Sequence, residues 1–171
     1  AHEEVDKAVT QTVLQGNMST LNCPEEVYLA EKMIELHPWA DMARFARTGG
    51  EAMVIAVRIA RAHTGRDKVA FCGYHGWHDW YLAANLNSSS ELEDHLLPGL
   101  EPNGVPKGLE GTALAFRYND IDSLKSLLEK YPDEIGTIVM EPLRSEFPKE
   151  GFLEEIRELA DQNQIVLIFD E

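Results

Sequence analysis

Apolar residues recur at three- and four-residue intervals through much of this 171-residue chain, and that spacing predicts amphipathic helices. Helices are predicted over residues 3–14, 24–37, 51–63, 121–130 and 150–163. Pro24 suits the first turn of the second helix, and His37-Pro38 suits its end. The middle of the third helix, residues 52–60, is nearly all apolar, so we expect this helix to be buried.

Short, mostly apolar runs lie between the helices and predict strands that are covered on both faces. Strands are expected over residues 42–47, 68–72, 112–116, 137–140 and 165–169. This alternation indicates an α/β protein with a mostly parallel sheet and helices on both faces. Residues 77–84 are expected to form a short helix or turn. Residues 85–111 are rich in Gly, Pro, Ser and Asn and predict a long loop of the kind that is more often functional than filler.

Ligands of open parallel sheets bind beyond the carboxyl ends of the strands. Four polar or glycine-rich segments directly follow predicted strands and therefore mark the candidate site. They are Thr48-Gly49-Gly50, Gly73-Tyr74-His75-Gly76, Glu141-Pro142 and Asp170-Glu171.

The segment Thr48-Gly49-Gly50 begins a predicted helix, where free backbone N–H groups and the absence of Cβ atoms favour phosphate binding. An ordinary strand-to-helix turn is the alternative. Tyr74 could stack on a planar ring. His75, His78 and Asp79 raise the question of a metal site, but neither the spacing of zinc proteases nor a further ligand is found, so no metal is expected.

Asp170 ends an apolar strand and could hold a cationic ring nitrogen in its protonated form. A Mg²⁺-binding ATPase strand is disfavoured because the chain lacks G-x-x-x-x-G-K-[ST], and a strand that simply reaches solvent remains possible. Glu141 could serve the same edge or cap a helix. No role is assigned to Glu171.

The formal net charge of −15 is spread along the chain, which disfavours nucleic-acid and anionic-membrane partners. No apolar run approaches the ~20 residues of a membrane span. The first residues lack the pattern of a signal peptide. Cys23 and Cys72 form no pair in sequence and suggest reduced, buried thiols. We therefore expect a cytoplasmic protein.

Taken together, the motifs resemble the class III (fold type I) aminotransferases that use pyridoxal 5′-phosphate, and the glutamate-1-semialdehyde 2,1-aminomutases most of all. The likeness covers essentially the whole chain in family order. The residues that carry it are Ala1–Val5, Arg44–Ala52, Ala56–Arg61, Thr64–Lys68, Gly73–Gly76, Gly104–Pro106, Tyr118–Asp120, Glu141-Pro142 and Ile168–Glu171.

The resemblance implies a role for each candidate residue. Gly49 and Gly50 would bind the cofactor phosphate, with Thr48 keeping one of two family hydroxyl positions and Gly50 losing the other. Tyr74 would stack on the pyridine ring with His75 beside it. Asp170 would pair with the ring N–H⁺, and Glu141 would lie near the cofactor's other side. The loop after Pro142 departs from the family. Its Arg144 could meet a substrate carboxylate or simply lie on the surface.

The resemblance also implies that residues 1–171 form part of a cofactor-binding large domain. The N-terminal segment, the half with the Schiff-base lysine and the small C-terminal domain would be absent, so no catalytic residue is assigned and the chain alone would be inactive. The whole enzyme would be a homodimeric aminotransferase or aminomutase acting on a small amino donor and acceptor. Alternatively, the chain acts as a structural or interaction module through an open sheet edge.

Overall fold

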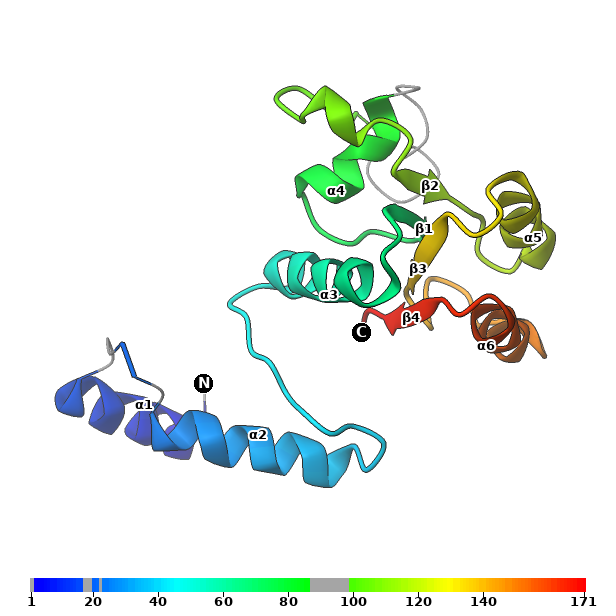
Figure 1. Cartoon of the computed structure of the whole chain (residues 1–171). Helices are drawn as coiled ribbons and strands as arrows, with labels where there is room; N and C mark the ends of the chain where they lie inside the picture. The colour runs from blue at the N-terminus through cyan, green and yellow to red at the C-terminus, as the bar shows by residue number, and fades with distance from the viewer. Residues whose placement is uncertain (1, 17–19, 22, 87–98) are drawn as a thin grey trace. The chain divides into compact units, whose positions relative to one another are not determined.

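The computed structural model describes residues 2–16, 20–21, 23–86 and 99–171. The chain divides into two compact units, residues 1–45 and 46–171, whose elements are labelled in Figure 1. The predicted loop over 85–111 lies partly outside the described residues. Its described parts include the end of η1 (Ala83–Leu86) and all of η3 (Lys107–Leu109).

The first unit contains two helices, α1 (Glu3–Gln15) and α2 (Pro24–Leu36), as the apolar spacing predicts. Pro24 is at the start of α2, where its missing N–H costs nothing, and Glu25 and Glu26 follow in the positive first turn. Neither helix has a buried residue. The expectation that Cys23 is buried is wrong, because this residue is the exposed N-cap of α2.

The second unit is built on a parallel sheet in the order β2-β1-β3-β4. Its strands are β1 (Lys68–Cys72), β2 (Ala113–Ala115), β3 (Ile135–Met140) and β4 (Val166–Phe169). The helices are α3 (Gly49–Thr64), α4 (Asp79–Leu82), α5 (Ile121–Lys130) and α6 (Phe152–Gln162). The α/β class and the parallel sheet are therefore confirmed.

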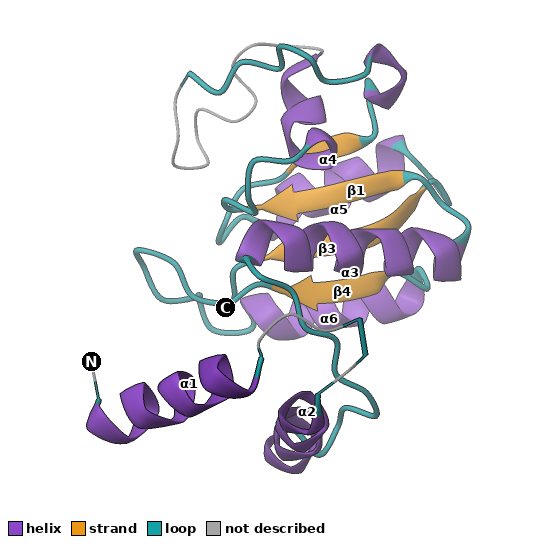
Figure 2. Ribbon diagram, turned by 90° about the vertical axis from the view of Figure 1, so that its left-hand side faces the viewer, coloured by secondary structure: helices purple, strands orange, loops and turns teal. Residues whose placement is uncertain are grey.

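Helices cover both faces of the sheet: α3 lies in front of the strands in Figure 2, and α5 and α6 lie behind them. Side chains of β1 alternate between the two layers, since successive residues of a strand point to opposite faces. Val69 and Phe71 pack in the core on the α3 side, whereas Ala70 and Cys72 pack in the core with α5 and α6. The central strands β1 and β3 contribute side chains to both cores.

The strand expected over residues 42–47 is wrong. Residues 42–46 form no helix or strand, and 47–48 are a bend before α3. A strand needs a neighbour to pair with, and the sheet β2-β1-β3-β4 includes no pairing for this run. The run also crosses the boundary between the two units at Phe45 and Ala46. The segment is mostly apolar but has no strand to pair with, so it forms a connecting segment before α3.

Fewer residues of α3 are buried than expected. Met53, Val57 and Ala60 are fully buried, at the spacing of one helix face, whereas Ile59 is 60% exposed. The helix therefore covers the sheet with a single face. No helix in the described ranges is long and apolar enough to cross a membrane.

Candidate functional site

The carboxyl ends of three neighbouring strands place Gly73, Glu141 and Asp170 side by side. Backbone pairing continues one step past the strands: the Glu141 N–H lies 3.4 Å from the Cys72 carbonyl oxygen, and the Asp170 N–H donates to the Met140 carbonyl at 2.9 Å. The expectation from topology that segments after strands meet at one edge is confirmed for these three. Thr48-Gly49-Gly50 follows no strand, because residues 42–46 form none. Parallel strands bring the three positions together because their carboxyl ends share that edge.

His75 and Asp170 contact each other directly across this edge. The Nδ1 atom of His75 lies 2.9 Å from Asp170 Oδ2, and its Nε2 atom lies 3.0 Å from the Cys72 carbonyl oxygen. His75 is 1% exposed, while the Asp170 side chain is 24% exposed. Both ring nitrogens are engaged, so neither offers a free lone pair to a metal ion.

Aromatic side chains pack behind this pair. The His75 ring stacks on Trp80 with centroids 6.3 Å apart. Tyr74 is half-buried and meets Tyr81 edge-on at 5.8 Å. The Tyr81 hydroxyl donates to the Gly73 carbonyl at 2.9 Å, and burial raises the pKa of this hydroxyl. Trp80 and Tyr81 are thus packing residues that fix the Gly73–Gly76 turn, whereas Trp77 is exposed.

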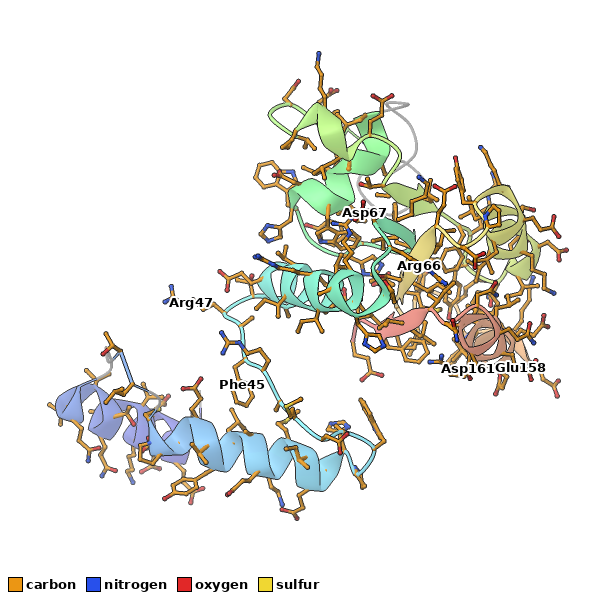
Figure 3. All side chains as sticks on the ribbon, viewed as in Figure 1. Phe45, Arg47, Arg66, Asp67, Glu158 and Asp161 are labelled. Carbon is orange, nitrogen blue, oxygen red and sulfur yellow. The ribbon has the colours of Figure 1, made fainter. Side chains whose placement is uncertain are left out.

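The start of α3 is fixed by a reciprocal cap. The Thr48 hydroxyl accepts from the Glu51 N–H at 3.2 Å, and the Glu51 carboxylate accepts from the Arg47 N–H at 3.0 Å. Arg47 is labelled just before α3 in Figure 3. Within the described ranges, the N–H groups of Gly49 and Gly50 have no acceptor. This helix end therefore presents free donors and the positive end of its dipole.

Two glycines let the α3 start and the Gly73–Gly76 turn approach each other closely. A Cβ atom on Gly76 would lie 2.7 Å from Gly50 Cα, and one on Gly50 would lie 2.8 Å from His78 Nε2. Gly76 also has φ +97°, which favours glycine. A Cβ on Gly49 would meet nothing within 4 Å, so space remains open in the first turn of the helix.

Glu141 does not cap a helix; its carboxylate forms an ion pair with Arg144, with Oε2 3.0 Å from Nε. The Arg144 side chain is only 13% exposed, so a simple surface position for this residue is excluded. The sequence carries one signal for this pair: Arg144 follows Glu141 by three positions in a turn that Pro142 rigidifies.

A polar hollow of about 460 Å³ lies at the opposite, amino edge of the sheet. Arg66 and Asp161 line it and are labelled in Figure 3. Arg66 is already used, because its guanidinium donates to the carbonyls of Ile135 and Asn163 at 3.2 and 2.8 Å. Ligands of open parallel sheets bind beyond the carboxyl ends of the strands, which favours the carboxyl edge over this hollow.

The chain is similar to known proteins over its whole length. The Aminotransferase class-III family model matches residues 1–171. The chain is 36% identical to 3-aminobutyryl-CoA aminotransferase of Cloacimonas acidaminovorans and 39% identical to glutamate-1-semialdehyde 2,1-aminomutase of Francisella tularensis subsp. holarctica. Each match covers 99% of this chain, but only 38% and 39% of the respective relative.

A solved structure described as a transaminase with PLP bound is 26% identical, with a TM-score of 0.82. The match covers 98% of this chain and 39% of that one. The resemblance based on the sequence motifs is confirmed, and so is the fold class. This chain belongs to the class-III aminotransferase family.

Proposed function

We propose that this chain is the pyridoxal 5′-phosphate-binding part of an aminotransferase or aminomutase that moves an amino group on a small amino-acid or semialdehyde-like substrate. One observation carries the proposal: the start of α3, the Tyr74-His75 turn, Glu141 and Asp170 meet at a single sheet edge, with His75 Nδ1 2.9 Å from Asp170 Oδ2. The family supports the same function, and the two named relatives leave transferase and mutase equally open.

The residues fit this cofactor. The free N–H groups of Gly49 and Gly50 and the open space beside Gly49 suit a phosphate group. The half-buried ring of Tyr74 offers a face for a pyridine ring. Asp170 offers a partly exposed carboxylate for a protonated ring nitrogen. Glu141 supplies a second acceptor at the same edge.

When bound, pyridoxal phosphate supplies an electron sink for bond breaking at the amino-bearing carbon of the substrate. This chain's residues would hold and orient it. Asp170 would keep a proton on the ring nitrogen, and His75 would fix the orientation of Asp170. Thr48 would keep the start of α3 in place for binding of the phosphate.

The chain spans less than two fifths of the length of the two named relatives. This supports the proposal that residues 1–171 are one part of a large cofactor-binding domain. The Schiff-base lysine and the small domain would then belong to the rest of a longer enzyme. This chain alone would show no transaminase turnover, because no amine at the edge would hold the cofactor covalently.

The whole enzyme would be a cytoplasmic homodimer acting on a small amino donor and acceptor. Apolar residues exposed on the first unit, among them Val5, Val9 and Leu36, support burial against another surface. The exposed, unpaired thiol of Cys23 is typical of a reducing compartment. Sedimentation velocity of the longer protein tests the dimer, and a monomer at micromolar concentration would refute it.

A titration with pyridoxamine 5′-phosphate tests cofactor binding by this chain. This amine form of the cofactor cannot form Schiff bases with surface lysines, so its binding reports the site alone. We expect saturable binding, and at least about tenfold weaker binding of pyridoxamine, which lacks the phosphate that the α3 start would hold. Equal affinity for both compounds would contradict a phosphate site at the start of α3. No binding of either compound would refute the proposed function.

A further inference from the structure

Arg144 and Glu141 form a partly buried ion pair at the edge where the cofactor would bind. The distance from Nε to Oε2 is 3.0 Å, and the side chains are 13% and 25% exposed. A pair this shielded from water is more strongly coupled than an exposed one. Removing one partner would leave the other charge desolvated without a counter-charge.

Other residues hold the Arg144 guanidinium in place. It lies over the Tyr118 ring, 5.9 Å from the centroid. The Tyr118 hydroxyl in turn donates to the carbonyl oxygen of Pro142 at 3.0 Å, which ties the ring to the same turn. The guanidinium also lies beside the Cys72 thiol. Burial raises the pKa of this thiol to about 12 in spite of the opposing charge of Arg144. Arg144 is therefore fixed from several sides and is not a free surface cation.

The absence of a side chain at Gly73 leaves the space that the Glu141 carboxylate occupies. A Cβ atom at Gly73, which has φ +115°, would collide with Oε2 of Glu141. Glu141 lies at the end of β3, between the ends of β1 and β4, and thus beside Asp170 in the sheet.

We propose that Arg144 is a positioning residue for the cofactor site: it holds the Glu141 carboxylate in place and oriented toward the ligand at the carboxyl edge. Arg144 acts through Glu141 and does not itself contact the cofactor. This inference rests on the proposed function for the identity of the ligand. Because Arg144 pairs with Glu141, its guanidinium would not be available to bind a substrate carboxylate.

A double-mutant cycle tests the proposal. Arg144→Gln, Glu141→Gln and the double variant are each titrated with pyridoxamine 5′-phosphate, and Arg144→Lys serves as the conservative rescue. We expect each single variant to bind about tenfold more weakly, and the double variant to lose no more than about twofold beyond either one. Arg144→Lys should recover part of the affinity, because it restores the positive charge.

Arg157→Gln is the matched control. Arg157 also pairs with a carboxylate within its own helix, at 2.6 Å from Asp161, but its side chain is 47% exposed. We expect this variant to bind like the wild type. Circular dichroism and urea unfolding show whether each variant is folded.

Two results would overturn the inference: losses of affinity that multiply in the double variant, or wild-type affinity in Arg144→Gln. A wild-type chain that binds no pyridoxamine 5′-phosphate would instead refute the proposed function. In that case the same cycle is measured on the urea midpoints of the ligand-free chain. Additive midpoint shifts would then show that Arg144 and Glu141 are not coupled.

Discussion

His75 Nδ1 lies 2.9 Å from Asp170 Oδ2, although the two residues are 95 positions apart in the sequence. The other ring nitrogen, Nε2, faces the Cys72 carbonyl oxygen, which can only accept a hydrogen bond. Nε2 therefore donates to this carbonyl, and Nδ1 makes the second hydrogen bond of the ring with Asp170 Oδ2. The histidine fixes one oxygen of Asp170 and leaves Oδ1 without a partner in the described part of the chain, available to a ligand.

Replacing His75 by Phe keeps a ring in the aromatic layer but removes both hydrogen bonds. The Cys72 carbonyl would lose a buried donor, and we expect the free energy of unfolding to fall by about 1–3 kcal/mol. Urea denaturation measures the change. His63→Phe on the exposed surface of α3 is the control and should change stability by less than about 0.5 kcal/mol. Equal stability of the two variants would show that the His75 contacts are not formed.

Gly76→Ala tests the close approach between α3 and the turn after β1. The new Cβ would lie 2.7 Å from Gly50 Cα. Gly104 is a matched control, since its φ is +90° and an added Cβ would meet nothing within 4 Å. We expect Gly104→Ala to cost about 1 kcal/mol for backbone strain. Gly76→Ala should cost about 1–3 kcal/mol more because of the clash. Similar unfolding midpoints for the two variants would contradict this geometry.

Thr48→Ala removes the side-chain cap of α3. We expect a loss of about 1 kcal/mol in the free energy of unfolding, because the Glu51 N–H loses its acceptor. Thr48→Ser keeps a hydroxyl and should stay close to the wild type. If serine were as destabilising as alanine, the cap would not be the contribution of Thr48.

Cys72 and Cys23 should differ sharply in reactivity. Cys72 is fully buried, and burial raises the pKa of its thiol from 9.0 to about 12, whereas Cys23 is exposed. Ellman's reagent should label one thiol of the native chain quickly at pH 8, and both thiols in urea. Cys23→Ser should abolish the fast reaction. Fast labelling that survives in Cys23→Ser would place Cys72 at the surface.

The raised pKa of Cys72 also fixes the direction of a pH effect. Above pH 9 the unfolded chain gives up this proton more readily than the native chain. The contribution of Cys72 to stability is therefore constant below pH 9 and falls by up to about 1.4 kcal/mol per pH unit on the way to 12. Lysines and tyrosines titrate in the same range, so the readout is the difference between wild type and Cys72→Ala. Identical pH slopes would contradict the shift.

Local pattern was enough for most of the fold. β1 at Lys68–Cys72 and α5 at Ile121–Lys130 have the predicted bounds, because each combines a clear periodicity with a definite boundary. The Asp120 side chain, for example, caps α5 by accepting from the Ser123 N–H at 3.2 Å. The run over residues 42–47 failed because strand formation depends on a partner, which local composition does not supply.

The site was predictable as a set of segments but not as a set of contacts. The topology of a parallel sheet is sufficient to bring Gly73, Glu141 and Asp170 to one edge. It does not reveal that His75 turns inward onto Asp170, or that Arg144 turns back onto Glu141. Those orientations depend on packing of His75 against Trp80 and of Arg144 against Tyr118. The sequence pattern does not show that these side chains meet.

The most direct test of cofactor binding at this edge is the affinity of Asp170→Asn for pyridoxamine 5′-phosphate. Asparagine keeps the shape of the side chain and removes its charge. Asp161→Asn, at an exposed carboxylate on α6, is the matched control. We expect Asp170→Asn to bind about 30-fold more weakly, the loss of one charged hydrogen bond of roughly 2 kcal/mol, and Asp161→Asn to bind like the wild type. Unchanged affinity in Asp170→Asn would contradict the assignment of the carboxyl edge as the cofactor site.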